Sequence, residues 1–260
     1  MAKRLSRKTR STQSNRLGYQ SLEPRQLLAT TSTLDPAIGQ LTIHLSEQND
    51  TAIVDTDDGR VTVNGNLDLD SNVSGVQSLS VQDLRTLTVN GSALEGQTLR
   101  LLGDFSESNG AGLDSVTISV VDQITVLGNY DIENDFRVSA PDAQQPFQSS
   151  IDEQTGRLIV GGSLSVDYGA DVLLDAGISA HQFGLVEGNF DGNLFIRSKE
   201  IEFGNTIVAE ELYLDARFTH QIADTSVSAT RLTNLGGVDL RNNKNDLTKS
   251  HCFRGCSKFT

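Results

Sequence analysis

Residues 157–167 read RLIVGGSLSVD, in which two short apolar alternations meet at a pair of glycines. Leu158 and Val160 precede the glycines, and Leu164 and Val166 follow them. Alternation with a period of two places one face of a strand toward a core and the other toward solvent. Glycine accepts positive φ, which suits a corner between two strands. The stretch therefore predicts short strands that bend at a glycine corner.

The same alternation recurs along most of the chain from about residue 40. No segment of a dozen residues carries apolar side chains at helical spacing, so the body is predicted to be almost wholly β. The other alternating stretches are VTVNGNLDLD (61–70), SLSV (78–81), LTVNG (87–91), VTISV (116–120), ITVLG (124–128), LFIRSKEIEF (194–203) and ELYLDARF (211–218).

Several of these stretches resemble one another, because each has an apolar residue, a Val and then a glycine. Strands that recur with glycine corners predict a parallel β-solenoid, or β-helix, in which successive coils stack. Low aromatic content favours this fold, and an antiparallel β-sandwich is the alternative that short strands also permit. Aligning the stretches makes five glycines equivalent: Gly65, Gly91, Gly128, Gly162 and Gly188.

The net charge of −13 is unevenly distributed. Residues 1–30 carry seven basic side chains against Glu23, and residues 241–260 carry five against Asp246, so the body between them is strongly acidic. An acidic body repels nucleic acid and anionic membranes, and only the two ends could attract them. We therefore expect no nucleic-acid partner. A nucleic-acid-binding basic arm remains the weaker alternative for residues 1–30.

The basic N-terminal segment is too poor in apolar residues for an ordinary secretory signal, which needs roughly 7 to 15 of them in a row. It falls further short of the roughly 20 that a membrane span requires, so no span is expected. A disordered or short-helical segment is the predicted structure. Its distinguishing stretch is SLEPRQLLA, residues 21–29.

A block of basic residues followed by this stretch resembles the LEPR-XLL segment near the N-terminus of exported and surface proteins of planctomycete bacteria. The resemblance covers about residues 3–29 and implies recognition by export or sorting machinery, with an extracellular or cell-surface destination. Gln20 stands where that segment often has an acidic residue. The residues that carry the motif are Leu22, Glu23, Pro24, Arg25, Leu27 and Leu28.

Three regions follow from these patterns. Residues 1–34 form the basic sorting segment, residues 35–241 the β-solenoid, and residues 242–260 a basic, irregular tail that is either an unrelated terminus or a truncation. Roughly residues 60–240 are similar in style to the β-helical repeats of filamentous-haemagglutinin-like and autotransporter-like surface proteins.

The sequence contains no diagnostic catalytic or metal-binding motif. Cys252 and Cys256 either have no role or form a small disulfide loop in an exported protein. Metal binding is not expected, because His251 is the only nearby third ligand and no second Cys or His pair completes a site. The stretch DTDDG (55–59) departs from calcium-loop spacing and indicates a polar turn. Ser163 lacks the final glycine of a nucleophile elbow. The four histidines, His44, His181, His220 and His251, are widely separated.

We therefore expect no cofactor, no metal and no catalytic residues. The predicted function is a secreted or cell-surface structural or adhesive protein whose partners are surface polysaccharide or other surface proteins. The alternative is a carbohydrate-active enzyme, a polysaccharide lyase or hydrolase, with carboxylates gathered on one face. The acidic residues considered for that role are Asp68, Asp70, Asp167, Asp171, Asp175 and Asp215.

Overall fold

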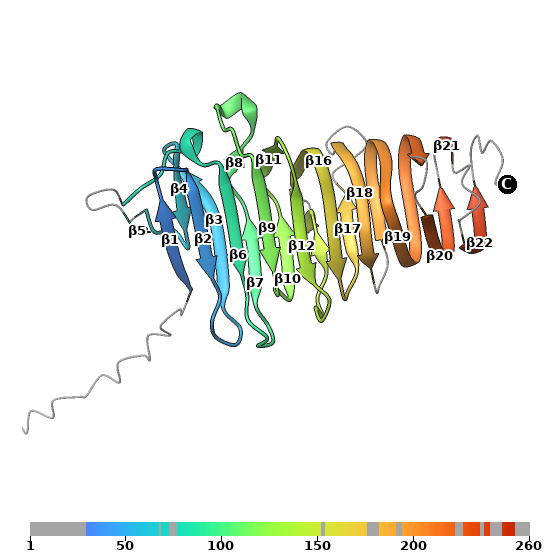
Figure 1. Cartoon of the computed structure of the whole chain (residues 1–260), viewed down its shortest axis with the longest axis horizontal. Coiled ribbons are helices and arrows are strands. Elements are labelled where there is room, and N and C mark those ends of the chain that lie inside the picture. The colour runs from blue at the N-terminus through green and yellow to red at the C-terminus, as the bar shows by residue number, and fades with distance from the viewer. Residues whose placement is uncertain are drawn as a thin grey trace, which may run out of the picture.

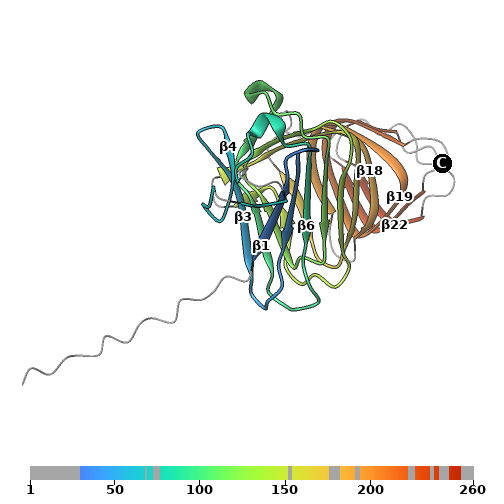
Figure 2. The same ribbon diagram turned by 60° about the vertical axis from the view of Figure 1, so that its left-hand side comes forward.

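The computed structural model describes residues 30–67, 69–72, 77–151, 154–175, 182–190, 194–221, 226–234, 237–239 and 246–252. These residues form an all-β body whose strands lie across its long axis (Figure 1). From β6 to β22 the strands run broadly in chain order toward the C-terminal end, whereas β5 lies beside β1 at the other end. Turned by 60°, the body shows β1, β3 and β6 at one end and β18, β19 and β22 at the other (Figure 2).

The longest ladder of parallel strands runs through the whole body. Its members pair successively in the order β2, β6, β9, β12, β16, β18, β19, β20 and β22. Their bounds are β2 Gln40–His44, β6 Thr86–Asn90, β9 Ser115–Ser119, β12 Phe136–Ala140, β16 Arg157–Tyr168, β18 Gln182–Phe190, β19 Leu194–Gln221, β20 Ser226–Asn234 and β22 Asp246–Cys252.

A second parallel ladder joins β3, β7, β10, β13, β17 and the start of β19. A third joins β8, β11 and the first half of β16, and β21 pairs with the end of β19. The bounds are β3 Thr51–Asp57, β7 Thr98–Leu101, β8 Asp104–Phe105, β10 Gln123–Val126, β11 Asn129–Ile132, β13 Phe147–Gln148, β17 Val172–Asp175 and β21 Gly237–Asp239.

Antiparallel strands cover the ladders where they begin. β1 (Thr31–Asp35) pairs with β2, and β4 (Arg60–Val63) pairs with β3. Such covering matters because an exposed sheet edge is a template for aggregation. The short strand β5 (Asp70–Ser71) pairs with β1, and β14 (Ser150–Ile151) pairs with β15 (Gln154–Thr155). Since most of the described pairings are parallel, the antiparallel β-sandwich is wrong.

The alternating apolar residues form rows in the interior. In the first ladder one buried row is Ile43, Val89, Ile118, Val138 and Val166, each paired in register with the next. Rows of this kind bury β-branched side chains against one another and exclude water. Aromatic rings also pack in the core, where the ring centroids of Phe105 and Tyr130 lie 4.8 Å apart.

The stretch that bends at two glycines does so without ending the strand. Residues 157–160 of β16 pair with β11, and residues 164–168 pair with β12. A Cβ at Gly161 would lie 2.4 Å from the carbonyl oxygen of Glu133, so close backbone approach excludes any larger residue. The Asp135 carboxylate fixes the bend by accepting a hydrogen bond of 2.9 Å from the Ser163 N–H.

The structure corrects three local predictions. Val81, expected in a strand, belongs to a 3₁₀ helix, η1 (Val81–Asp83), and a second one, η2, covers Glu107–Asn109. The tail is not irregular throughout, because β22 pairs in register with β20. β1 begins at Thr31, inside the segment assigned to residues 1–34.

The five aligned glycines also do not stack on one another. Gly91 lies against the carbonyl of Val120, whereas Gly128 lies against that of Gly103. The resemblance between these stretches therefore reflects similar corners at different places in the fold. Their backbone conformations also differ, because Gly65 has a left-handed φ of 72°, whereas Gly91 and Gly128 do not.

Candidate functional site

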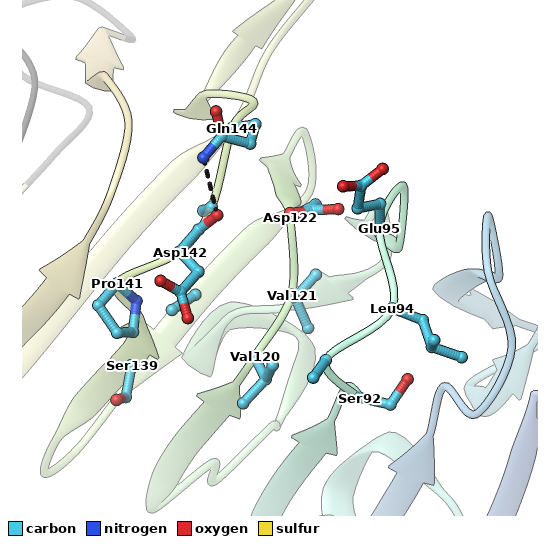
Figure 3. Close-up of a pocket in the computed structure, with 13 residues that line it drawn as sticks. Ser92, Leu94, Glu95, Val120, Val121, Asp122, Ser139, Pro141, Asp142 and Gln144 are labelled. Atoms are coloured by element: carbon cyan, nitrogen blue, oxygen red, sulfur yellow. Dashed lines mark hydrogen bonds between the residues drawn. The ribbon is translucent and has the colours of Figure 1, made fainter.

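A hollow of about 710 Å³ lies where the loops after β6, β9 and β12 stack at one edge of the body (Figure 3). The loop after β9, residues 120–122, is shorter than its neighbours, residues 91–97 and 141–146. The long loops therefore form two walls and the short loop forms the floor. The lining residues are Ser92, Ala93, Leu94, Glu95, Val120, Val121, Asp122, Ser139, Ala140, Pro141, Asp142, Ala143 and Gln144.

Gln97 holds the first wall in place. This fully buried side chain donates from Nε2 to the carbonyl of Leu45, at 2.9 Å, and its Oε1 accepts from the Ser92 N–H at 2.7 Å. The Asn49 N–H donates to the carbonyl of Glu95 at 3.1 Å. A buried amide that is satisfied in this way fixes the backbone around it. The wall is therefore anchored to the preceding corner, residues 45–50.

Val120 forms an exposed apolar floor in an unfavourable backbone conformation. Its φ is 55°, in the left-handed region that a β-branched residue rarely occupies, and its side chain is 44 % exposed. Backbone contacts hold it there, because Val120 N–H donates to the Ser139 carbonyl at 2.8 Å and the Gly91 N–H donates to the Ser119 carbonyl at 2.7 Å. A Cβ at Gly91 would lie 1.8 Å from the Val120 oxygen, so this corner needs glycine.

Tyr168 supports the hollow from inside the core. Its hydroxyl lies 2.8 Å from the carbonyl oxygen of Asp122 and 3.0 Å from that of Gln145, and it donates to this pair of acceptors. Burial raises the pKa of the Tyr168 phenol, and the nearby charge of Asp122 raises this pKa further. The hydroxyl therefore stays protonated and joins the floor to the second wall.

Three carboxylates line the hollow, and they come from its three loops. Asp122 accepts a short hydrogen bond from the Gly96 N–H, which ties the floor to the first wall. Glu95 and Asp142 stand on opposite sides of Val121 (Figure 3). No three His, Cys, Asp or Glu side chains in the described ranges are placed to hold a metal ion. The carboxylates thus give the hollow negative charge without forming a cation site.

The predicted site residues have mixed outcomes. The sorting motif, Leu22 to Leu28, lies outside the described residues and stays a prediction. The DTDDG stretch is the β3–β4 hairpin, where Asp58 and Gly59 both have positive φ, 48° and 72°. An Asp-Gly pair with this geometry is the preferred two-residue hairpin turn. The interpretation as a polar turn is therefore confirmed.

Ser163 and the histidines do not meet in the described part of the chain. Ser163 uses its backbone N–H to bind Asp135, and His44 is an exposed residue at the end of β2. His181 lies outside the described residues, as does Cys256, and nothing is described of the side chains of His220, His251 or Cys252.

Of the six acidic residues considered for an enzyme site, the three whose side chains are described, Asp70, Asp167 and Asp171, do not line the hollow. Asp68 lies outside the described residues, and the side chains of Asp175 and Asp215 are not described. Glu95, Asp122 and Asp142 were not singled out, because the sequence does not show that their three loops lie side by side. The unequal lengths of the three loops would have located them. The sequence does not show these lengths as a pattern, because the loops become neighbours only through the pairing of β6, β9 and β12.

No known protein family, curated protein or solved structure matches the chain. Within the described residues, no helix has the length and apolar character needed to cross a bilayer.

Proposed function

We propose that the body is a parallel β-solenoid that serves as a structural or adhesive module outside the cell or on its surface, without catalytic activity. The observation that carries this proposal is the ladder from β2 to β22, in which each strand pairs in parallel with the next member of the ladder, and the members follow one another in chain order. Nine strands spaced about 4.8 Å apart give a body roughly 40 Å long.

The pairing offset supports the solenoid. In the later part of the ladder, Ile207 pairs with Val227 and Ala229 pairs with Leu247, about 20 residues apart in each case, which suits one coil of a repeat protein. Each coil contacts only its neighbours, so the length and stiffness of such a body depend on repeated local contacts. A long acidic surface of this kind suits display and repeated weak binding.

The proposed destination is supported by the LEPR-XLL resemblance and is tested by an export assay. Residues 1–40 are fused to a reporter in a planctomycete host, and Leu22 to Arg25 are changed to alanine. A matched control changes residues 11–14, STQS, to alanine. We expect the first change to abolish export and the second to leave it intact. Equal export of both variants would show that the motif is not an address.

The adhesive role is tested with the purified full chain and isolated surface polysaccharide or envelope protein. Saturable binding to either supports it. Binding to neither, in a chain that is shown to reach the surface, limits the role to a structural one.

The alternative, a carbohydrate-active enzyme, is favoured by one observation, the three carboxylates around the hollow. It predicts release of reducing sugar from a polysaccharide substrate and loss of that release in Glu95→Gln/Asp142→Asn. Asp122 is excluded from the test because it holds the Gly96 backbone. Activity that these changes remove would replace the structural proposal with the enzymatic one.

A further inference from the structure

The hollow combines uncompensated negative charge with exposed apolar surface. Its lining contains no Lys, Arg or His, and neither Glu95 nor Asp142 takes part in an ion pair within the described residues. Leu94 is 48 % exposed and Val120 is 44 % exposed, although both are large apolar side chains. The complementary partner is therefore a short segment that carries a positive charge next to apolar residues.

The described chain begins beside this hollow. Thr30 Oγ1 donates to the carbonyl of Thr51 at 3.1 Å, and Thr31 pairs with His44 at the end of β2. Both contacts lie at the corner formed by residues 45–50, and Asn49 of that corner bonds directly to the loop that carries Glu95. Two strand spacings, about 10 Å, separate this corner from the floor of the hollow.

Residues 1–29 combine positive charge with apolar side chains, which complements the acidic and apolar lining of the hollow. They carry seven basic side chains against one acidic side chain, and Arg25 is followed by Leu27 and Leu28. β1 lies one spacing further out than β2, so about 14 Å separates Thr31 from the floor. An extended chain covers about 3.4 Å per residue, so the five residues from Thr30 back to Arg25 span about 17 Å and reach the floor. We infer that the segment from Arg25 to Leu28 docks in the hollow of its own chain, with Arg25 between Glu95 and Asp142.

In this arrangement Leu27 and Leu28 cover the exposed Leu94 and Val120. If the segment is the address proposed above, on which this part of the inference rests, a folded body covers its own address and an unfolded chain exposes it. The export machinery would then recognise the segment before the body folds.

Trypsin cleavage after Arg25 tests the docking in the full chain, with each rate divided by the rate in the same chain unfolded in urea. We expect Glu95→Lys/Asp142→Lys to be cleaved at least fivefold faster than the unchanged protein. Glu107→Lys/Glu133→Lys makes the same charge change at exposed positions outside the hollow and should leave the rate unchanged. High salt should raise the rate of cleavage after Arg25 in the unchanged protein, because it screens the attraction between Arg25 and the two carboxylates.

A second variant leaves the body untouched. Leu27→Ser/Leu28→Ser should accelerate cleavage after Arg25 to the same extent, whether or not the lysine variant folds well. Equal normalised rates in the unchanged protein and in Leu27→Ser/Leu28→Ser would overturn the inference. Protection that increases with protein concentration would also overturn it, in favour of docking between two copies.

The export assay and this one fail independently, because the reporter fusion has no hollow. Unchanged export in the motif variant would refute the address and leave the docking intact. Equal normalised cleavage rates in the unchanged protein and in Leu27→Ser/Leu28→Ser would refute the docking and leave the address intact.

Discussion

Two buried tyrosines should respond in opposite ways to the loss of a hydroxyl. Tyr130 and Tyr168 are both almost fully buried. The Tyr168 hydroxyl bonds to two backbone carbonyls, whereas the Tyr130 hydroxyl has no hydrogen-bond partner in the described part of the chain. Replacing each with phenylalanine keeps the ring and removes one oxygen, so the two variants form a matched pair.

The expected magnitudes follow from the cost of unpaired polar groups. Tyr168→Phe loses a net hydrogen bond and leaves two carbonyls without this donor, so the free energy of unfolding should fall by about 2 kcal/mol. Tyr130→Phe removes a hydroxyl that is buried without compensation, so the free energy of unfolding should stay unchanged or rise by about 1 kcal/mol.

Urea denaturation followed by circular dichroism measures both effects, with equal m-values as the check that the unfolding transition is comparable. The two midpoints should differ by an amount equivalent to about 2 to 3 kcal/mol. A Tyr130→Phe variant that is destabilised as much as Tyr168→Phe would refute the reasoning, because it would show that Tyr130 has a partner.

Three further predictions concern alkaline stability, the corners and acid stability. Burial raises the pKa of Tyr130, and the charge of Asp55 makes a smaller contribution in the same direction. The contribution of the protonated Tyr130 to stability should therefore be fully present below about pH 10 and be lost as the pH rises above it, so the melting temperature should fall less steeply in Tyr130→Phe. Equal slopes of melting temperature against pH in the two proteins would contradict this. Gly128→Ala would bring a Cβ within 2.1 Å of a carbonyl oxygen and should cost more than about 2 kcal/mol in urea denaturation, whereas Gly59→Ala meets nothing within 4 Å and should cost about 1 kcal/mol from its positive φ alone. The hydrogen bond from the Ser163 N–H and then Arg137 lower the pKa of Asp135, so the stabilisation by its carboxylate is present above about pH 4 and lost as the pH falls below that. Asp135→Asn should therefore melt at a lower temperature than the unchanged protein at pH 7 but not at pH 2.5. The exposed control Asp83→Asn should melt with the unchanged protein at both pH values.

The strands were predictable because alternation records which side chains face the core. The stretches around Leu87, Ile118 and Ile124 are strands with those residues buried. Val81 was mispredicted because one apolar residue on either side of a serine fits a 3₁₀ turn equally well. β22 was missed because DLTKSHC has a single aliphatic residue, and its pairing with β20 is what makes it a strand.

The register and the hollow could not be predicted. The glycine alignment treated Gly91 and Gly128 as equivalent, although each is required by a different neighbouring carbonyl. Close approach to a carbonyl leaves no trace in the sequence beyond the glycine itself, so the sequence does not show which strands and loops lie beside one another. The hollow depends on that order, because it forms only where the short loop at Val120 lies between two longer ones.

The in-register parallel ladder is tested most directly by backbone nuclear Overhauser contacts in isotope-labelled protein. The structure predicts contacts between Thr88 and Thr117, between Thr117 and Arg137, and between Arg137 and Ser165, across four consecutive strands. Close Hα–Hα contacts between these strands, which antiparallel pairs show at their non-hydrogen-bonded positions, would contradict the parallel arrangement.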